Sequence, residues 1–222
     1  LERSYIDMLR RNMVDGVIVN SLNIGAEAYA EMGLSLVGID CDLGEASVQI
    51  ASDSYSIGEL ATRRLIDDGC SRILCLRSNS RMRMPANKRT DAYLDVVEQA
   101  GLPALVREVE FVKPDDEKSA VVAKILDENP DIDGIFAGDD TMAAICLNVM
   151  KQRGLSAPGD IKVVGADGAR RTMTFMPDLT TVRQDIDRIG ELAAQSIIAL
   201  INGEKPESNI KLPVELIEGK TA

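Results

Sequence analysis

The chain has 222 residues, which is enough for one large domain or for two smaller lobes with a buried core. Its 45% hydrophobic and 27% charged residues are typical of a globular protein, and only 3% are aromatic, which predicts an aliphatic core. The net charge of -11 argues against direct binding to nucleic acid or to an anionic membrane, because non-specific DNA binding depends on Lys and Arg. The absence of His excludes Ser-His-Asp and Cys-His catalysis.

Neither the cysteines nor the termini point to secretion or to a membrane. Cys41, Cys70, Cys75 and Cys146 lie in or beside apolar runs and form no C-x-x-C pair, which predicts reduced thiols. We expect neither a signal peptide nor a membrane span, because the sequence shows no signal pattern and no apolar run long enough to cross a bilayer. We expect a cytoplasmic protein without a metal or a cofactor. Leu1 begins directly in an amphipathic segment, so we also expect the chain to be part of a longer one.

Strand-like and helix-like runs alternate along the chain. The predicted strands are Gly16–Asn20, Ser35–Asp40, Ser47–Ala51, Arg72–Arg77, Val106–Phe111, Gly134–Gly138, Ile161–Gly165, Thr180–Val182 and Lys211–Ile217. The predicted helices are Arg3–Asn12, Ile24–Glu31, Ile57–Asp68, Ala86–Ala100, Asp116–Glu128, Thr141–Arg153 and Ile186–Ile201. Strands separated by helices of this length indicate βαβ units and parallel sheets.

The order of these elements predicts an α/β fold of two lobes, each a parallel sheet flanked by helices. The strands from Arg72 to Gly165 form one complete set, whereas the three earlier strands form an incomplete one. We assign residues 1–69 and 184–203 to a partial N-terminal lobe, and residues 70–183 and 204–222 to a C-terminal lobe. A ligand cleft is expected between the lobes.

Three carboxylates follow predicted strands, where open α/β sheets bind their ligands. Asp167 comes after Ile161–Gly165, Asp139 after Gly138, and Asp40 ends the second strand. A carboxylate there accepts hydrogen bonds from hydroxyls or amines; the alternative is an ordinary turn Asp. We expect Asp140 to cap the next helix, which leaves Asp139 free to face the cleft. Two adjacent Asp residues without a third ligand are weak evidence for a metal.

Arg89 lies in the first turn of a predicted helix, where a cation opposes the helix dipole. That cost suggests a ligand-binding role for Arg89, because a planar guanidinium can clamp a carboxylate, a phosphate or vicinal hydroxyls. The alternative is a solvated surface Arg. Further cations, Arg77, Arg81, Arg83 and Lys88, precede it. They form either a solvated face or a site for an anionic effector.

Eight segments occur in an order that resembles the effector-binding core of the lactose/galactose repressor family. They are Val14–Val19, Val37–Asp40, Gly58 to Gly69, Arg89 to Tyr93, Ile135–Asp140, Val163–Asp167, Leu179–Asp185 and Leu212–Ile217, and they cover nearly the whole chain. By this resemblance, Arg89 and Asp167 match the effector-binding Arg and Asp of the family. Asp139 matches a position that is often Asn or Ser, and Asp40 matches an Asp beside the cleft. The family's aromatic residue near Val112–Pro114 is missing here.

The resemblance also implies what the chain lacks. The family's helix-turn-helix headpiece and the first βαβ unit of its N-terminal lobe have no counterpart here. We therefore predict that Gly16–Asn20 has an exposed edge unless a partner chain covers it. A homodimer is expected, with DNA bound only through the missing headpiece.

The resulting functional prediction is the effector-sensing domain of a bacterial transcription regulator, which is not an enzyme. It binds a small polar metabolite, a sugar or a sugar phosphate, between its lobes and so controls DNA binding. The main alternative is a solute-binding protein for sugar uptake, which shares the fold. A doubly wound enzyme is a third class, and the chain has no G-x-G-x-x-G, P-loop or G-x-S-x-G motif to support it.

Overall fold

The computed structural model describes residues 14–20, 35–41, 43, 47–78, 85–110 and 113–222. The chain divides into two compact units. The first comprises the described residues of Leu1–Asp53 and Arg83–Pro85 together with Asp185–Pro213; the second comprises Ser54–Met82, Ala86–Gln184 and Val214–Ala222. The predicted helices Arg3–Asn12 and Ile24–Glu31 lie outside the described residues.

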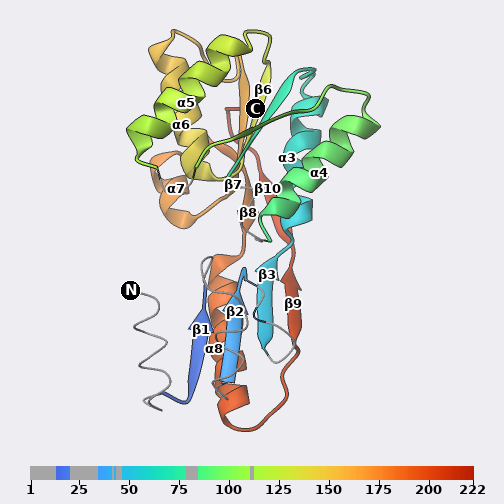
Figure 1. The fold of residues 1–222 in the computed structure, drawn as a ribbon, viewed down its shortest axis with the longest axis vertical. Coiled ribbons are helices and arrows are strands. Elements are labelled where there is room, and N and C mark those ends of the chain that lie inside the picture. The colour runs from blue at the N-terminus through green and yellow to red at the C-terminus, as the bar shows by residue number, and fades with distance from the viewer. Residues whose placement is uncertain (1–13, 21–34, 42, 44–46, 79–84, 111–112) are drawn as a thin grey trace. The chain divides into compact units, whose positions relative to one another are not determined.

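Among the described residues, the first unit contains a four-stranded parallel sheet against which helix α8 (Ile186–Ile201) packs (Figure 1). Its strand order is β1 (Gly16–Val19), β2 (Ser35–Ile39), β3 (Val48–Ser52) and β9 (Asn209–Leu212). Helix α8 buries Ile189 and Ala193 against Val37 and Ile50. Among the described residues β1 pairs with β2 alone, in agreement with the predicted edge at this strand.

The second unit contains a six-stranded sheet of order β10-β8-β7-β6-β4-β5. The strands are β4 (Ile73–Arg77), β5 (Leu105–Glu108), β6 (Gly134–Ala137), β7 (Lys162–Asp167), β8 (Thr180–Gln184) and β10 (Val214–Ile217). All neighbours are parallel except β10, which runs antiparallel to β8 at one edge. The carboxyl ends of the five parallel strands therefore meet at one edge of the sheet, where the candidate side chains were predicted.

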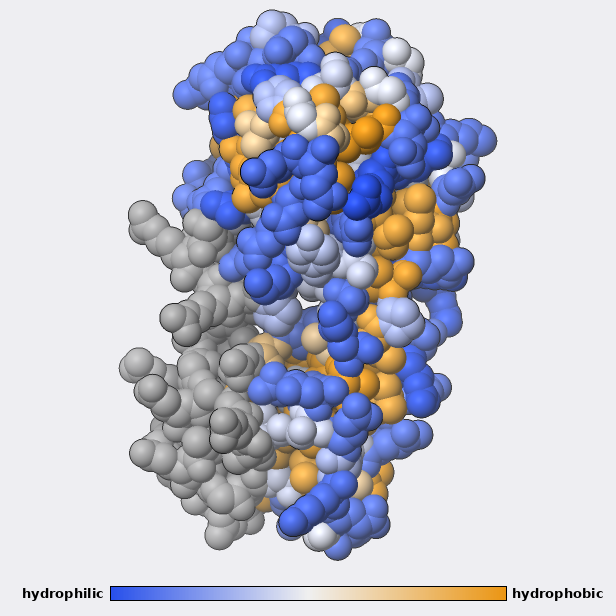
Figure 2. Space-filling view, turned by 90° about the vertical axis from the view of Figure 1, so that its right-hand side faces the viewer, coloured by the Kyte–Doolittle hydropathy of each residue, from blue (hydrophilic) through white to orange (hydrophobic). Residues whose placement is uncertain are grey.

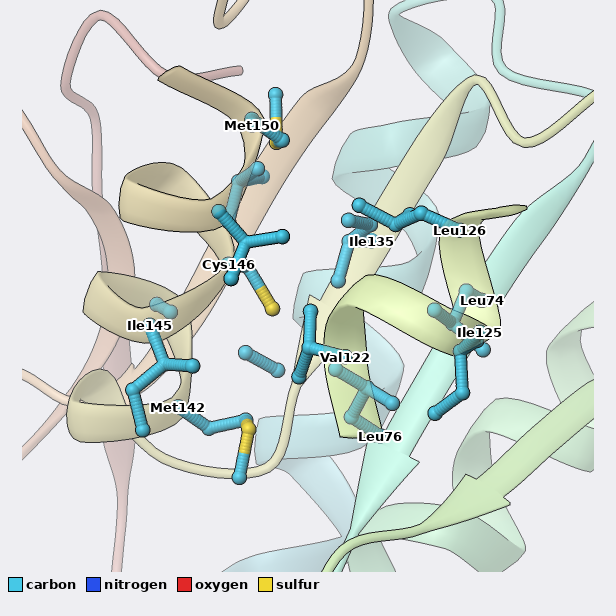
Figure 3. Packing of buried hydrophobic residues seen from close by; sticks show 14 of the residues in the cluster. Leu74, Leu76, Val122, Ile125, Leu126, Ile135, Met142, Ile145, Cys146 and Met150 are labelled. Atoms are coloured by element: carbon cyan, nitrogen blue, oxygen red, sulfur yellow. The ribbon is translucent and has the colours of Figure 1, made fainter. Parts of the chain in front are cut away.

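Both faces of this sheet are buried, which explains its nearly continuous apolar strands. Successive side chains of a strand point to opposite faces, so Ile73 and Cys75 pack in one cluster and Leu74 and Leu76 in the other. Helices α3 (Ser54–Asp67) and α4 (Asn87–Gln99) cover the first face, and α5 (Asp115–Glu128) and α6 (Asp140–Gln152) cover the second (Figure 1). Figure 3 shows side chains of α5 and α6 packed around the strand residues of the second face.

Two boundaries differ from the predicted lobes. Residues 54–69 were assigned to the N-terminal lobe, but Ile57, Ala61 and Leu65 are fully buried in the core of the second unit. Residues 204–213 were assigned to the C-terminal lobe, but β9 pairs with β3 in the first unit. The predicted strand Lys211–Ile217 is thus two strands in two sheets. Pro213 separates them because it has no N–H to donate to a ladder.

Figure 2 shows one face of the described surface, where polar and charged side chains predominate and smaller groups of apolar side chains lie between them. Among the described residues, the most exposed large apolar side chain is Phe175, at 76%, in the short helix α7 (Arg170–Phe175), which was not predicted. No helix in the described part of the chain is long and apolar enough to cross a bilayer.

Helices α3 and α4 are in close contact at Gly58. A Cβ atom at this position would collide with the backbone carbonyl of Arg89, which cannot move away as a flexible side chain could. Gly190 in α8 offers a matched control, because a Cβ atom there would meet no atom within 4 Å.

We expect Gly58→Ala to lower the free energy of unfolding by about 1–3 kcal/mol, as overpacking typically does. Gly190→Ala should leave it unchanged or raise it by up to about 1 kcal/mol, because Ala favours the helix. Urea unfolding followed by circular dichroism measures both. Equal effects of the two substitutions would contradict the close approach at Gly58.

Candidate functional site

Two residues of the described chain other than glycine have a positive φ, and both were predicted to bind the effector. They are Asp40, at 50°, directly after β2, and Asp167, at 106°, the last residue of β7. Such conformations are costly for residues with a Cβ atom and cluster at functional sites. Asp40 lies in the first unit, where its N–H donates to the carbonyl of Ile50 at 3.0 Å. Asp167 and the remaining candidates lie in the second unit.

The backbone after Asp167 is also constrained. Gly168 has a φ of 56°, and a Cβ atom there would lie 2.7 Å from the Cβ of Arg183 on the neighbouring strand. Only glycine fits this turn without a shift of β8. The turn therefore fixes the direction in which the Asp167 carboxylate leaves the sheet.

The structure brings Arg89 and Asp167 into direct contact. The Nη2 of Arg89 donates to the Oδ1 of Asp167 at 2.9 Å, and its Nη1 donates to the carbonyl oxygen of Gly138 at 2.5 Å. The Nε2 of Gln184, at the end of β8, donates to the same Oδ1 at 2.6 Å. The Arg89 side chain is only 11% exposed. One ion pair thus links the first turn of α4 to the ends of β6, β7 and β8.

The N-cap of α6 is Asp139, and not Asp140 as was predicted. Asp139 is the N-cap of α6, and its carboxylate accepts from the N–H of Met142 at 2.7 Å. A capping residue has an extended backbone just before the first helical residue, and Asp139 has φ -153° and ψ 168°. The helix begins one residue earlier than predicted, so Asp140 is its first residue and is buried.

Asp140, the first residue of α6, instead forms hydrogen bonds to β8 and to the turn after β7. Its Oδ1 accepts from the hydroxyl of Thr181 on β8 at 2.6 Å, and its Oδ2 accepts from the N–H of Gly168 at 2.8 Å. Its exposed fraction is 3%. Asp140 therefore holds the turn that carries Asp167.

We refer to Arg89, Asp139, Asp140, Asp167 and Gln184 as the carboxylate cluster. Burial raises the pKa of the Asp167 carboxyl; the charge and hydrogen bond of Arg89 oppose this rise, and the charge of Asp139 adds to it. Burial raises the pKa of Asp140 to about 6, with a further contribution from the charges of Asp167 and Asp139. The carboxylates are thus close enough to affect one another, and the one guanidinium stabilises the ionised form of Asp167.

Sequence reasoning did not assign a role to Gln184 or Thr181. Both lie on β8, and Gln184 ends that strand at the same edge of the sheet as Asp167. The rule that selected the aspartates, a polar residue at the carboxyl end of a parallel strand, would have found Gln184 as well. No group of three His, Cys, Asp or Glu residues among those described is arranged to hold a metal ion.

The pKa of Asp140 gives a pH dependence with a defined sign. Because the pKa rises from 3.8 to about 6 on folding, the folded state binds a proton more tightly than the unfolded state. This stabilisation is complete below the unfolded pKa and is lost as the pH rises through about 6.

We expect wild type to gain roughly 1 kcal/mol relative to Asp140→Asn between about pH 7.5 and about pH 5.5. Urea unfolding of both proteins at the two pH values measures this difference. Thr181→Val should shift the transition to higher pH, since the Thr181 hydrogen bond favours the ionised carboxylate. A difference that stays constant over this range would show that Asp140 does not titrate there.

Comparison with known proteins places this geometry in a family. The family described as periplasmic binding protein-like domain matches residues 62–222. The sucrose operon repressor of Pediococcus pentosaceus is 33% identical over 223 residues, which span 100% of this chain and 68% of that protein. This chain therefore corresponds to about two thirds of the repressor's length.

Solved structures agree with the sequence comparison. The complex of the transcriptional regulator CelR with cellobiose has a TM-score of 0.89 and 27% identity, over 99% of this chain and 69% of that one. A periplasmic binding protein/LacI transcriptional regulator from Alkaliphilus metalliredigens QYMF, complexed with D-xylulofuranose, has a TM-score of 0.87 and 25% identity, over 100% of this chain and 82% of that one. The chain belongs to the lactose-repressor family of transcription regulators, as the periplasmic-binding-protein-like part that binds the effector.

Proposed function

We propose that this chain binds a sugar at the carboxylate cluster and thereby controls DNA binding by a regulator. The observation that carries the proposal is the buried contact between Arg89 and Asp167, held by Gln184 and by the Gly138 carbonyl at adjacent strand ends. These two residues occupy the positions that the family resemblance gives to the effector-binding Arg and Asp. The similar structures with cellobiose and with D-xylulofuranose support a sugar as the ligand class.

Each residue of the cluster has a proposed part in binding. Asp167 accepts hydrogen bonds from sugar hydroxyls through Oδ2, since its hydrogen bonds to described residues engage Oδ1. Arg89 orients Asp167 through its ion pair and its hydrogen bond to Gly138. Asp139 offers the carboxylate oxygen that does not cap α6. Asp40, from the first unit, is proposed as a further hydroxyl acceptor because of its strained position after β2.

The proposal includes the mode of regulation. A sugar that binds one arrangement of the two units more tightly than another shifts the population toward that arrangement. In a homodimer with DNA-binding headpieces, such a shift changes the affinity for the operator. The chain would act in the cytoplasm, without catalysis and without a cofactor. The curated relative, a sucrose operon repressor, favours this function over solute uptake.

Arg89 provides the direct test. Sucrose, ribose, cellobiose and D-xylulose are screened by thermal shift, because a ligand that binds only the native state raises the melting temperature. The affinity of a sugar that binds is then measured by calorimetry for wild type and for Arg89→Ala. We expect a loss of about 10- to 100-fold, the range for hydrogen bonds to a charged group.

Two further variants separate binding from folding. Arg89→Lys keeps the charge but loses the planar fork, so an intermediate loss is expected. Arg63→Ala removes an Arg of α3 that is half exposed and pairs with Glu59, and it should bind as wild type does. Unchanged affinity in a folded Arg89→Ala protein would remove Arg89 from the site.

A further inference from the structure

Three hydrogen bonds from the donors of the carboxylate cluster are directed at groups of the protein itself. Arg89 gives Nη1 to Gly138 and Nη2 to Asp167, and Gln184 also donates to Asp167. An anionic ligand such as a phosphate needs several such donors, often N–H groups at a helix N-terminus. Both terminal nitrogens of the Arg89 guanidinium, which would clamp a phosphate as a fork, are therefore oriented here by groups of the protein itself.

The backbone donors nearby are engaged in the same way. The N-terminus of α6 is capped by Asp139, which takes the N–H of Met142. The N–H of Gly168, in the turn after β7, is taken by Asp140. Both positions carry a carboxylate where a phosphate-binding site presents free N–H groups and positive potential.

The charges of the cluster lead to the same conclusion. The guanidinium of Arg89 pairs with Asp167, and the cluster contains two further carboxyl groups, those of Asp139 and Asp140. The charge of Asp139 raises the pKa of both other carboxyls, which places all three within electrostatic reach of one another. At neutral pH the cluster is therefore negative, and a phosphate brought beside it would be repelled.

What the cluster offers a ligand is mainly acceptor oxygens. The hydrogen bonds of Asp167 and Asp139 to described residues engage the Oδ1 of each, and both residues are partly exposed. Carboxylate oxygens recognise hydroxyl groups, which donate.

Within the described residues, the basic segment before Arg89 does not offset the negative charge of the cluster. Arg77 donates to Glu108 at 2.8 Å, and Lys88 donates to Asp91 at 3.1 Å. Arg81 and Arg83 lie outside the described residues. The two described cations that favoured an anionic effector in the sequence are thus paired with carboxylates of their own.

We infer that the carboxylate cluster selects an uncharged, hydroxyl-rich sugar and discriminates against the phosphate ester of the same sugar. This inference rests on the proposed function, because it specifies the ligand of the same site. It separates the two ligand classes that the sequence left open, a sugar and a sugar phosphate.

Matched pairs of ligands test the inference. Ribose is compared with ribose 5-phosphate, glucose with glucose 6-phosphate, and fructose with fructose 6-phosphate, by calorimetry at neutral pH. For every pair that binds we expect the neutral sugar to bind at least about tenfold more tightly than its ester. An ester that binds as tightly as its parent sugar, or more tightly, would overturn the inference and leave sugar binding intact. If no sugar and no ester binds the folded protein, the proposed function itself is wrong.

Asp139→Asn shows whether charge is the cause. Asn also caps helices, so α6 should keep its N-terminus while the cluster loses one negative charge. We expect the ratio of the affinity for the neutral sugar to the affinity for its ester to fall by roughly threefold or more. Asp127→Asn is the control, because it removes the same charge at an exposed residue of α5 that pairs with Arg153. An equal change in both variants would contradict a local effect of the cluster.

Discussion

The site of the second unit depends on the buried ion pair between Arg89 and Asp167. A charge in such a place is costly unless it is paired and hydrogen-bonded, and here each partner has a further contact: Gly138 for Arg89 and Gln184 for Asp167. Loss of either partner would leave an uncompensated charge between α4 and the sheet. The position of Arg89 depends in turn on Gly58, whose lack of a side chain lets α3 lie against the backbone of Arg89. A packing contact on one face of the sheet thus sets the geometry of the site.

Asp140 supplies the second constraint, from the opposite side of the sheet. It carries no free oxygen toward a ligand, since Thr181 and Gly168 take one each. Its effect is to hold the strained backbone of Asp167 in one conformation. A site whose charged groups are fixed before the ligand arrives loses less entropy on binding than one that must be ordered. The pKa of about 6 follows mainly from the same burial.

The sequence predicted the alternation of strands and helices and the edge of the sheet at which polar residues gather, because both follow from local pattern. It assigned residues 54–69 to the wrong unit, since a helix at a junction has the same pattern whichever sheet it covers. Asp139 and Asp140 are equally good caps, so a shift of one residue in the start of α6 moved the cap from Asp140 to Asp139. The strands β9 and β10 form one strand-like run in the sequence, and their pairing with different sheets separates them.

The charge of Arg89 has a different meaning in the structure than in the sequence alone. In the sequence, a cation in the first turn of a helix suggests that an anion is attracted there, because the helix dipole opposes the cation. In the structure that anion is Asp167, and the carboxylates of Asp139 and Asp140 lie beside it. The positive charge of the Arg89 guanidinium therefore stabilises a group of acidic side chains at the carboxyl end of the sheet. A ligand can therefore bind the cluster by donating hydrogen bonds from its hydroxyl groups to the carboxylates. An anionic ligand would be repelled by the same carboxylates.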